Sequence, residues 1–98
     1  MKTFGDCKIG DIIYSRKLEA CLIEEQTIEN IKIINDFIIV KLKDENRAFN
    51  CNKSVDIKSS ILYCCDKKCC IQDLTSTIKM LQENIYMCQQ QLQKYENI

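Results

Sequence analysis

Hydrophobic side chains recur at alternating spacings of three and four residues through the last third of the chain. This heptad spacing is typical of a helix that packs along one face against another helix. The a and d positions of the heptads carry Ile71, Leu74, Ile78, Leu81, Ile85, Cys88, Leu92 and Tyr95. Because no glycine or proline interrupts this stretch, the sequence predicts one long amphipathic helix over residues 66–97.

The predicted helix is too long to be covered by the rest of the chain. It would extend about 48 Å at about 1.5 Å per residue, whereas a globule of about 65 residues has a diameter of about 28 Å. The far half of the seam would then face water, although burial of such side chains is favourable. We therefore expect a homo-oligomer that associates through this helix, since closed homo-oligomers are the default assembly. Cover by the N-terminal domain or by a foreign partner is the alternative.

The sequence leaves the number and direction of the associated helices open. Isoleucine at a with leucine at d favours a parallel dimer, whereas Met80 and Met87 widen the apolar face as in a four-helix packing. The flanking e and g positions are all uncharged: Thr75, Gln82 and Gln89 at e, and Thr77, Asn84 and Gln91 at g. Dimer or tetramer, and parallel or antiparallel pairing, are therefore both undecided. In a parallel pair in register, Cys88 would meet its own mate.

Residues 1–65 have the alternating pattern of short strands. Gly10-Asp11 predicts a turn before the first strand, and Asn35-Asp36 predicts a tight hairpin. The expected strands cover residues 12–14, 22–34, 37–43, 48–51 and 61–63, with a turn at 44–47. Four or five antiparallel strands with short links predict a meander that closes into a small barrel. The fold class is therefore α+β, with a small β-barrel over 1–65 followed by the oligomerisation helix over 66–97.

Two of these strands have residues expected to point into the barrel. They are Ile28, Ile31 and Ile33 on the second strand, and Ile38, Val40 and Leu42 on the third. The slip of one residue between Ile28 and Ile31 predicts a bulge, which would help a small sheet to curl.

Composition and charge narrow the function. Fourteen basic side chains balance fourteen acidic ones and histidine is missing, so there is no strong field for nucleic acid and no common general base. No apolar run is long enough to span a membrane, and residues 1–8 lack the apolar core of a secretory signal. We expect a cytoplasmic protein, in a bacterial cytosol, that is not an enzyme, needs no cofactor and does not act on membranes or nucleic acid.

Eight cysteines are present, four of them within the segment Cys64-Cys65-Asp66-Lys67-Lys68-Cys69-Cys70. Thiols at this density favour zinc, with Cys51 as a further ligand. The spacing lacks the two-residue knuckle of structural zinc sites, however, and adjacent cysteines rarely face one ion. We therefore expect these cysteines to fill the joint between strand and helix as small apolar residues, with no bound metal. A metal-binding or redox-active thiol site is the alternative.

Basic residues from several predicted turns form the candidate ligand site. They are Arg16, Lys17, Lys41, Lys43 and Arg47. In a meander these turns lie near one end of the barrel, where the side chains would bind a phosphate or a nucleotide. Ordinary surface charge is the other interpretation.

Three short segments resemble a skeleton found in a diffuse group of small proteins from Firmicutes genomes and phages. The skeleton reads G-D-x-[VI]-Y … V-x-x-I-x-I … V-F-x-T-x-x-E-A. Here it is matched by Gly10-Asp11-Ile12-Ile13-Tyr14, by Ile28, Ile31 and Ile33, and by Ile61-Leu62-Tyr63 before the helix. The match spans residues 9–74, and the group has no settled function. The group's threonine cap and small alanine correspond to Cys65 and Cys69, which the resemblance places near the helix N-cap and against the core.

These observations predict a homo-oligomeric binding protein. Its size and composition are typical of a phage or mobile-element accessory protein that inhibits a bacterial host process such as defence. It would do so by occupying a host protein or by sequestering a nucleotide signal between subunits, with Arg16, Lys17 and Arg47 on the phosphates. The competing interpretation is a small metal- or thiol-responsive regulator that uses the Cys64 to Cys70 cluster, and a thiol enzyme is a third.

Overall fold

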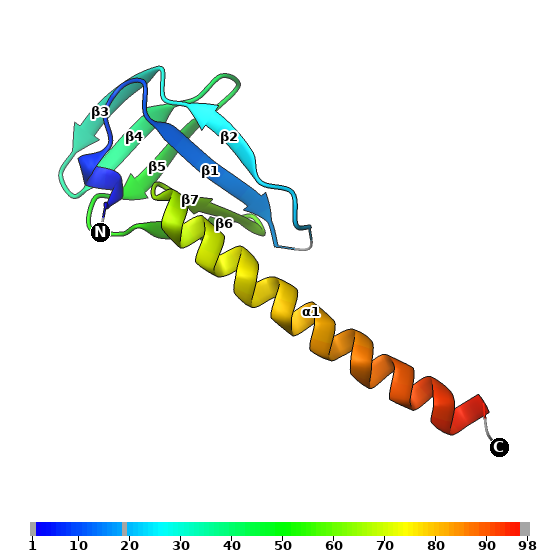
Figure 1. Ribbon diagram of the computed structural model, residues 1–98. Helices are drawn as coiled ribbons and strands as arrows, with labels where there is room; N and C mark the ends of the chain where they lie inside the picture. Colours follow the sequence, from blue (N-terminus) through cyan, green and yellow to red (C-terminus); the bar gives the residue numbers. More distant parts are fainter. Residues whose placement is uncertain (1, 19, 97–98) are drawn as a thin grey trace.

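The computed structural model describes residues 2–18 and 20–96. Within them the chain forms a short 3-10 turn, seven strands and one long helix (Figure 1). The elements are η1 (Phe4–Asp6), β1 (Ile12–Lys17), β2 (Glu24–Thr27), β3 (Asn30–Ile34), β4 (Phe37–Lys41), β5 (Asn46–Asn50), β6 (Val55–Lys58), β7 (Ile61–Cys64) and α1 (Lys67–Glu96). The fold class is α+β, as the sequence predicts.

The strands form two antiparallel sheets, with the orders β2-β1-β7-β6 and β3-β4-β5. The sequence predicts four or five strands that close into a small barrel. The described residues form seven strands in two sheets, and because these sheets are not closed, the domain is a barrel only in a loose sense. The single strand expected over residues 22–34 is in fact β2 and β3, which belong to different sheets. The chain changes sheet at Ile28 and Glu29 instead of forming a bulge, and Ile28 is buried at the crossing.

The turns explain which hairpins the sequence could predict. Asn35 has a φ of 54° in the β3–β4 turn, as expected for a tight turn on Asn-Asp. The β6–β7 hairpin turns instead on Ser59 and Ser60, whose φ values are 52° and 62°. Serine rarely adopts this conformation, so the sequence carries no signal for this turn, and β6 was not predicted.

The core lies between the two sheets and is centred on three aromatic rings. Phe4 from η1 stacks on Phe49 with ring centroids 4.2 Å apart, and Tyr63 lies 5.4 Å from Phe49. The predicted inward residues Ile28, Ile38, Val40 and Leu42 are buried among them. Ile31 is half-buried at the margin of the core. Ile33 is 61% exposed, contrary to the expectation, because it lies on an edge strand close to the hairpin turn.

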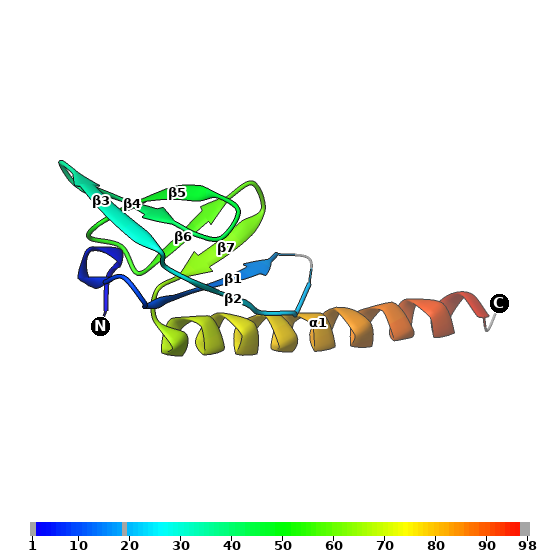
Figure 2. The same cartoon turned by 90° about the horizontal axis from the view of Figure 1, so that it is seen from above.

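Helix α1 leaves the domain and runs far beyond it (Figures 1 and 2). Its first turn is capped by Asp66, whose carboxylate accepts a hydrogen bond from the Lys68 backbone N–H at 2.9 Å. The capping residue therefore directly follows Cys65, which the resemblance places near the cap. The helix packs on β1 and β7, and the whole molecule measures 62 × 27 × 21 Å. In the described part of the chain, no helix is both long enough and apolar enough to cross a membrane.

Candidate functional site

The seam of α1 is exposed along almost its whole length. We use the name seam for the eight a and d residues: Ile71, Leu74, Ile78, Leu81, Ile85, Cys88, Leu92 and Tyr95. Leu74 is half-buried, and every other seam residue is exposed, the large ones by 42% to 66%. The helix does not fold back onto the domain (Figure 2). The sequence predicts that the domain covers about the first half of the seam, but it covers only Leu74, and that only in part.

We use the name β domain for η1 and the seven strands. The β domain contacts only the beginning of α1. Cys69 and Cys70 are the buried residues of the helix, and Cys70 packs against Leu62 and Cys64 of β7. Beyond Thr77 every described helix residue is exposed. The anchoring contacts are therefore confined to the first three turns, and they fix the direction in which the rest of the helix projects.

Arg16 of β1 makes the polar part of this anchor. Its side chain is buried, with 1% of its surface exposed, and Nη2 forms an ion pair with the Asp73 carboxylate of α1. The same nitrogen donates to Thr77 Oγ1 at 3.2 Å, and Nη1 donates to the Ala20 carbonyl oxygen at 2.9 Å. The charge that the sequence assigned to a phosphate site is thus compensated by an aspartate 57 residues away.

Removing the carboxylate of Asp73 should loosen the base of the helix. Asp73→Ala leaves the buried guanidinium without its ion partner, and we expect a loss of about 1–2 kcal/mol in the free energy of unfolding. The value lies at the low end because Asp73 is itself about one third exposed. Urea denaturation measures the change. Glu83→Ala removes an exposed carboxylate from the free part of α1 and serves as the control. Equal stabilities for the two variants would contradict the anchoring role of Arg16.

The adjacent residues Cys64 and Cys65 at the joint between β7 and α1 have different thiol partners. Cys65 points into the main core, where its thiol is hydrogen-bonded to that of Cys7. Cys64 belongs to the smaller cluster under α1, where its thiol is hydrogen-bonded to that of Cys70. Adjacent cysteines therefore face different clusters, as expected of residues that pack. The contact of Cys7 with Cys65 was not predicted, because 57 residues separate the two in the sequence.

These positions do not converge on a metal ion. Cys51 lies beside Gly5, where a glycine is needed because an added Cβ would come within 2.9 Å of the Cys51 Cβ. Across residues 2–18 and 20–96, no three Cys, Asp or Glu side chains are grouped so as to hold a metal. The geometry therefore gives the metal interpretation no support, and the two thiol pairs favour the packing role.

Burial suppresses the reactivity of the thiols at this joint. It raises the pKa of Cys64 from 9.0 to about 12 and also raises the pKa of Cys70. The interaction between Cys7 and Cys65 raises the pKa of Cys65 and lowers that of Cys7, and the Cys65 thiol lies within hydrogen-bond distance of the Lys2 and Ser54 carbonyl oxygens. The thiolate is the reactive form, so Cys64 and Cys65 should be inert near neutral pH.

Alkylation of the native protein at pH 8 should therefore modify the exposed Cys21 and Cys88 first, with Cys64 and Cys65 unmodified until the protein unfolds. Peptide mass mapping over time measures the order. Rapid modification of Cys64 or Cys65 in folded protein would contradict the packing role and favour a reactive thiol.

The raised pKa of Cys64 also predicts that the free energy of unfolding falls between pH 9 and 12, since the unfolded chain loses the Cys64 proton before the folded chain does.

The basic residues of the candidate ligand site do not form a free cationic cluster. Arg47 pairs with Glu45 at 2.8 Å and lies over the Tyr63 ring, and Arg16 is used by Asp73. Lys41 and Lys43 are exposed side chains on and after β4. Of the five, Arg16 and Lys17 line one pocket, and the other three do not.

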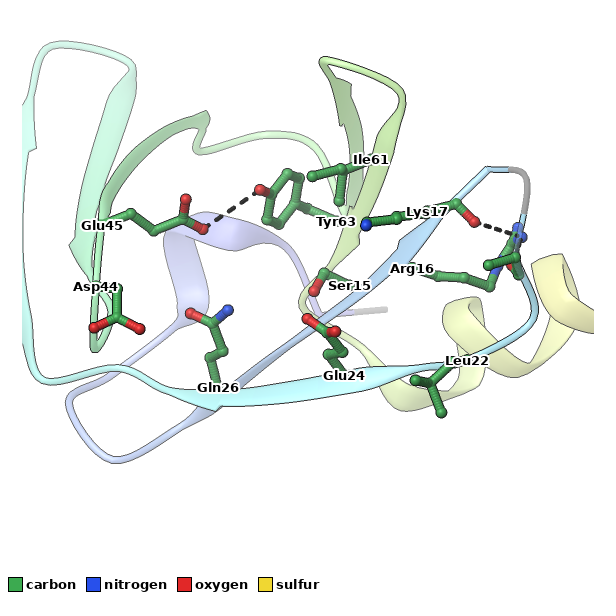
Figure 3. A pocket seen from close by; sticks show the side chains of 11 residues that line it. Ser15, Arg16, Lys17, Leu22, Glu24, Gln26, Asp44, Glu45, Ile61 and Tyr63 are labelled. Atoms are coloured by element: carbon green, nitrogen blue, oxygen red, sulfur yellow. Dashed lines mark hydrogen bonds between the residues drawn. The ribbon is translucent and has the colours of Figure 1, made fainter.

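That pocket lies between the end of β1, the start of β2 and the turn before β5 (Figure 3). Its volume is about 410 Å³, and Glu24, Asp44 and Glu45 bring three carboxylates to its walls. Figure 3 shows Lys17 directed toward Tyr63, whose hydroxyl lies 3.4 Å from Glu45 Oε1, and Arg16 turned away from the carboxylates. Three carboxylates around one free ammonium group are a poor environment for a phosphate, so the geometry does not favour an anion site here.

No family model matches the chain, and neither the curated proteins nor the solved structures contain a match to it. The resemblance to small Firmicutes and phage proteins therefore stays a prediction. Among the described surfaces, the seam presents exposed apolar side chains at regular spacing along the helix.

Proposed function

We propose that the protein is a non-enzymatic, homo-oligomeric binding protein whose subunits associate through the seams of their α1 helices. One observation carries this proposal: beyond Thr77, all six seam residues are exposed on a helix that extends away from its own domain. Full burial of a large apolar side chain contributes about 1.5–3 kcal/mol, so covering half-exposed side chains still favours association. Continuous apolar surfaces of this kind mark interaction sites.

A second copy is the partner that best fits this surface. The seam keeps the regular heptad spacing that lets one helix pack its side chains between those of another helix. Any copy of the chain carries the complementary surface, because both helices have the same spacing. A closed pair of identical chains then covers both seams at once.

The β domain carries the surface that we assign to another protein. Ile33, Ile34 and Phe37 are all exposed around the turn of the β3–β4 hairpin. This turn lies at the end of the domain away from the free end of α1 (Figure 1). Association through α1 therefore leaves these side chains accessible to a partner.

We propose that the protein acts in the bacterial cytosol as a phage or mobile-element accessory protein that inhibits a host process by occupying a host protein. Support comes from the apolar hairpin turn and from the resemblance noted above. Sequestration of a nucleotide between subunits is less favoured, because Arg16 and Arg47 are already paired with carboxylates.

A thiol-responsive regulator is the second candidate. The observation that favours it is the lowered pKa of Cys7, whose thiol interacts with that of Cys65. The order of alkylation described above tests it. Metal analysis of the purified protein tests the hypothesis of a metal-responsive regulator, since stoichiometric zinc would favour it over a binding protein.

Mass determination in solution tests the proposed function. Light scattering and sedimentation equilibrium over a range of concentrations should give the mass of two or four chains of 11.5 kDa each. A species of 11.5 kDa at every concentration would contradict self-association. Replacing seam residues such as Ile85 and Leu92 tests whether this mass depends on the seam.

A further inference from the structure

We propose that the α1 helices pair in antiparallel orientation, in the register that places Ile85 of one subunit level with Cys88 of the partner subunit. This inference rests on the proposed function, because it names the geometry of the same association. In this arrangement the two β domains lie at opposite ends of the paired helices. The sequence alone left the orientation open, and the structure supplies the boundary that decides it.

The boundary is the point at which α1 leaves its domain. Thr77 contacts the β domain by accepting a hydrogen bond from Arg16, every described helix residue beyond Thr77 is exposed, and the described part of the helix runs to Glu96. The free part of the seam therefore runs from Ile78 to Tyr95, with three a and three d residues. The set of six is Ile78, Leu81, Ile85, Cys88, Leu92 and Tyr95.

Reversing one helix makes this free segment complementary to itself. The reversal brings a positions level with d positions of the partner subunit. Ile78 then meets Tyr95 of the partner subunit, Leu81 meets Leu92 of the partner subunit, and the symmetry repeats each contact. All six residues are covered, and in this register Glu96 of the partner subunit lies level with Thr77, where the β domain begins.

The β domain flanks the seam before that point. Tyr14 and Ile23 form a hollow with Lys67, Cys70 and Ile71 at the first turn of α1. Leu74, one turn of the helix further on, is half-buried. A parallel partner helix in register would have to run along these turns beside both domains. In the antiparallel register, residues 77–96 of the partner helix lie level with residues 77–96 instead of with these turns.

The sizes of the facing side chains also favour the antiparallel register. A parallel pair in register would stack the small Cys88 on its own mate and the large Tyr95 on its own mate. The antiparallel register instead sets Cys88 against Ile85 and Tyr95 against Ile78. Cores pack best when large side chains face small ones, so this register has neither an undersized nor an oversized layer.

The polar positions beside the seam permit this pairing. Parallel coiled coils commonly fix their orientation with charge pairs between e and g positions, but in this chain Gln82, Asn84, Gln89 and Gln91 are uncharged. In the antiparallel register Gln82 lies near Gln89 of the partner subunit, and Asn84 lies near Gln91 of the partner subunit. Amide side chains both donate and accept hydrogen bonds, so these contacts are compatible.

Disulfide trapping distinguishes the two orientations. The starting protein is the full chain with Cys21→Ser and Cys88→Ser, which removes the two exposed thiols. Leu81→Cys and Leu92→Cys are then introduced separately into this background. The two variants are oxidised mildly, each alone and as a mixture that has been unfolded and refolded together. Gel electrophoresis without reductant and peptide mapping identify any link.

We expect a link between residues 81 and 92 in the mixture and no link between like positions in either variant alone. In the antiparallel register like positions are 11 residues apart along the axis, about 16 Å, and a disulfide needs Cα atoms within about 7 Å. Links in each variant alone would show parallel pairing and overturn this inference.

The mass of the starting protein separates this inference from the function on which it rests. A single-chain mass contradicts self-association itself. An associated protein that links like positions leaves self-association intact and contradicts only the antiparallel register. An associated protein that links neither like nor unlike positions also contradicts the register. Gln90→Cys, made in the same background, is the control. Because residue 90 lies on the outward side of the helix, this variant should form no link alone or mixed with either of the other two variants.

Discussion

Replacing Ile85 and Leu92 together by aspartate should convert the associated protein into a single-chain species of 11.5 kDa. Both side chains are more than half exposed in the isolated subunit and lie beyond the β domain. The β domain should therefore stay folded. An associated pair would have to bury four unpaired carboxylates between two helices, and the desolvation cost of such groups exceeds what the remaining seam contributes. Light scattering at the concentrations that give the native assembly measures the change in mass.

The loss of association should also unwind the free part of α1. A single helix of this length in water is only marginally stable, so far-ultraviolet circular dichroism should show a loss of helix while the strand signal persists. The matched control is Gln90→Asp with Gln93→Asp, which adds the same charge to the outward side of the same turns. The control should keep the native mass. A native mass for the Ile85 and Leu92 variant would contradict the seam as the interface.

Replacing Phe49 by alanine should have the largest effect on stability of any single change in the β domain. Its ring is fully buried and stacks on Phe4 with ring centroids 4.2 Å apart, and the tilted Tyr63 ring lies 5.4 Å from it. Truncating a buried phenylalanine costs about 3–5 kcal/mol, and folded domains are stable by only about 5–15 kcal/mol. We expect the midpoint of urea unfolding to fall sharply, or the β domain to be unfolded in water.

Phe37→Ala is the control for this prediction, since it deletes the same side chain from the neighbouring β4. Phe37 is 52% exposed near the hairpin turn, so its loss should change the free energy of unfolding by less than about 1 kcal/mol. Comparable losses for the two variants would contradict the placement of the core between the sheets. If Phe37→Ala folds normally, the same variant also tests whether the exposed β3–β4 hairpin contributes to binding a protein partner.

The features that the sequence predicted are those encoded by local periodicity. The sequence predicts a helix over residues 66–97, and within the described residues the helix spans Lys67–Glu96, with residue 97 outside them. Unbroken heptads and good helix formers specify this helix without help from the rest of the fold. The turn at Asn35 followed from a residue that tolerates positive φ. Ile38 and Val40 are buried as expected, because strict alternation fixes the inward face of a strand.

The features that the sequence could not predict depend on contacts between distant segments. The change of sheet at Ile28 has the same local pattern as a bulge in a continuous strand. The sequence places Arg16 in a candidate ligand site, since no local pattern indicates that Asp73 lies beside it in the fold. Likewise, the cysteine cluster has the density of a metal site, and only the packing shows that Cys64 and Cys65 face different clusters.

The projection of α1 also has a hydrodynamic consequence. The subunit has a radius of gyration of 17.8 Å, whereas a compact domain of this length would have about 13 Å. A globule with a long projecting segment, helical or unwound, experiences more friction than a sphere of equal mass, so even a lone subunit should elute early from a gel-filtration column. Elution volume calibrated with globular standards would therefore overstate the number of chains, and small-angle scattering should show the elongation directly.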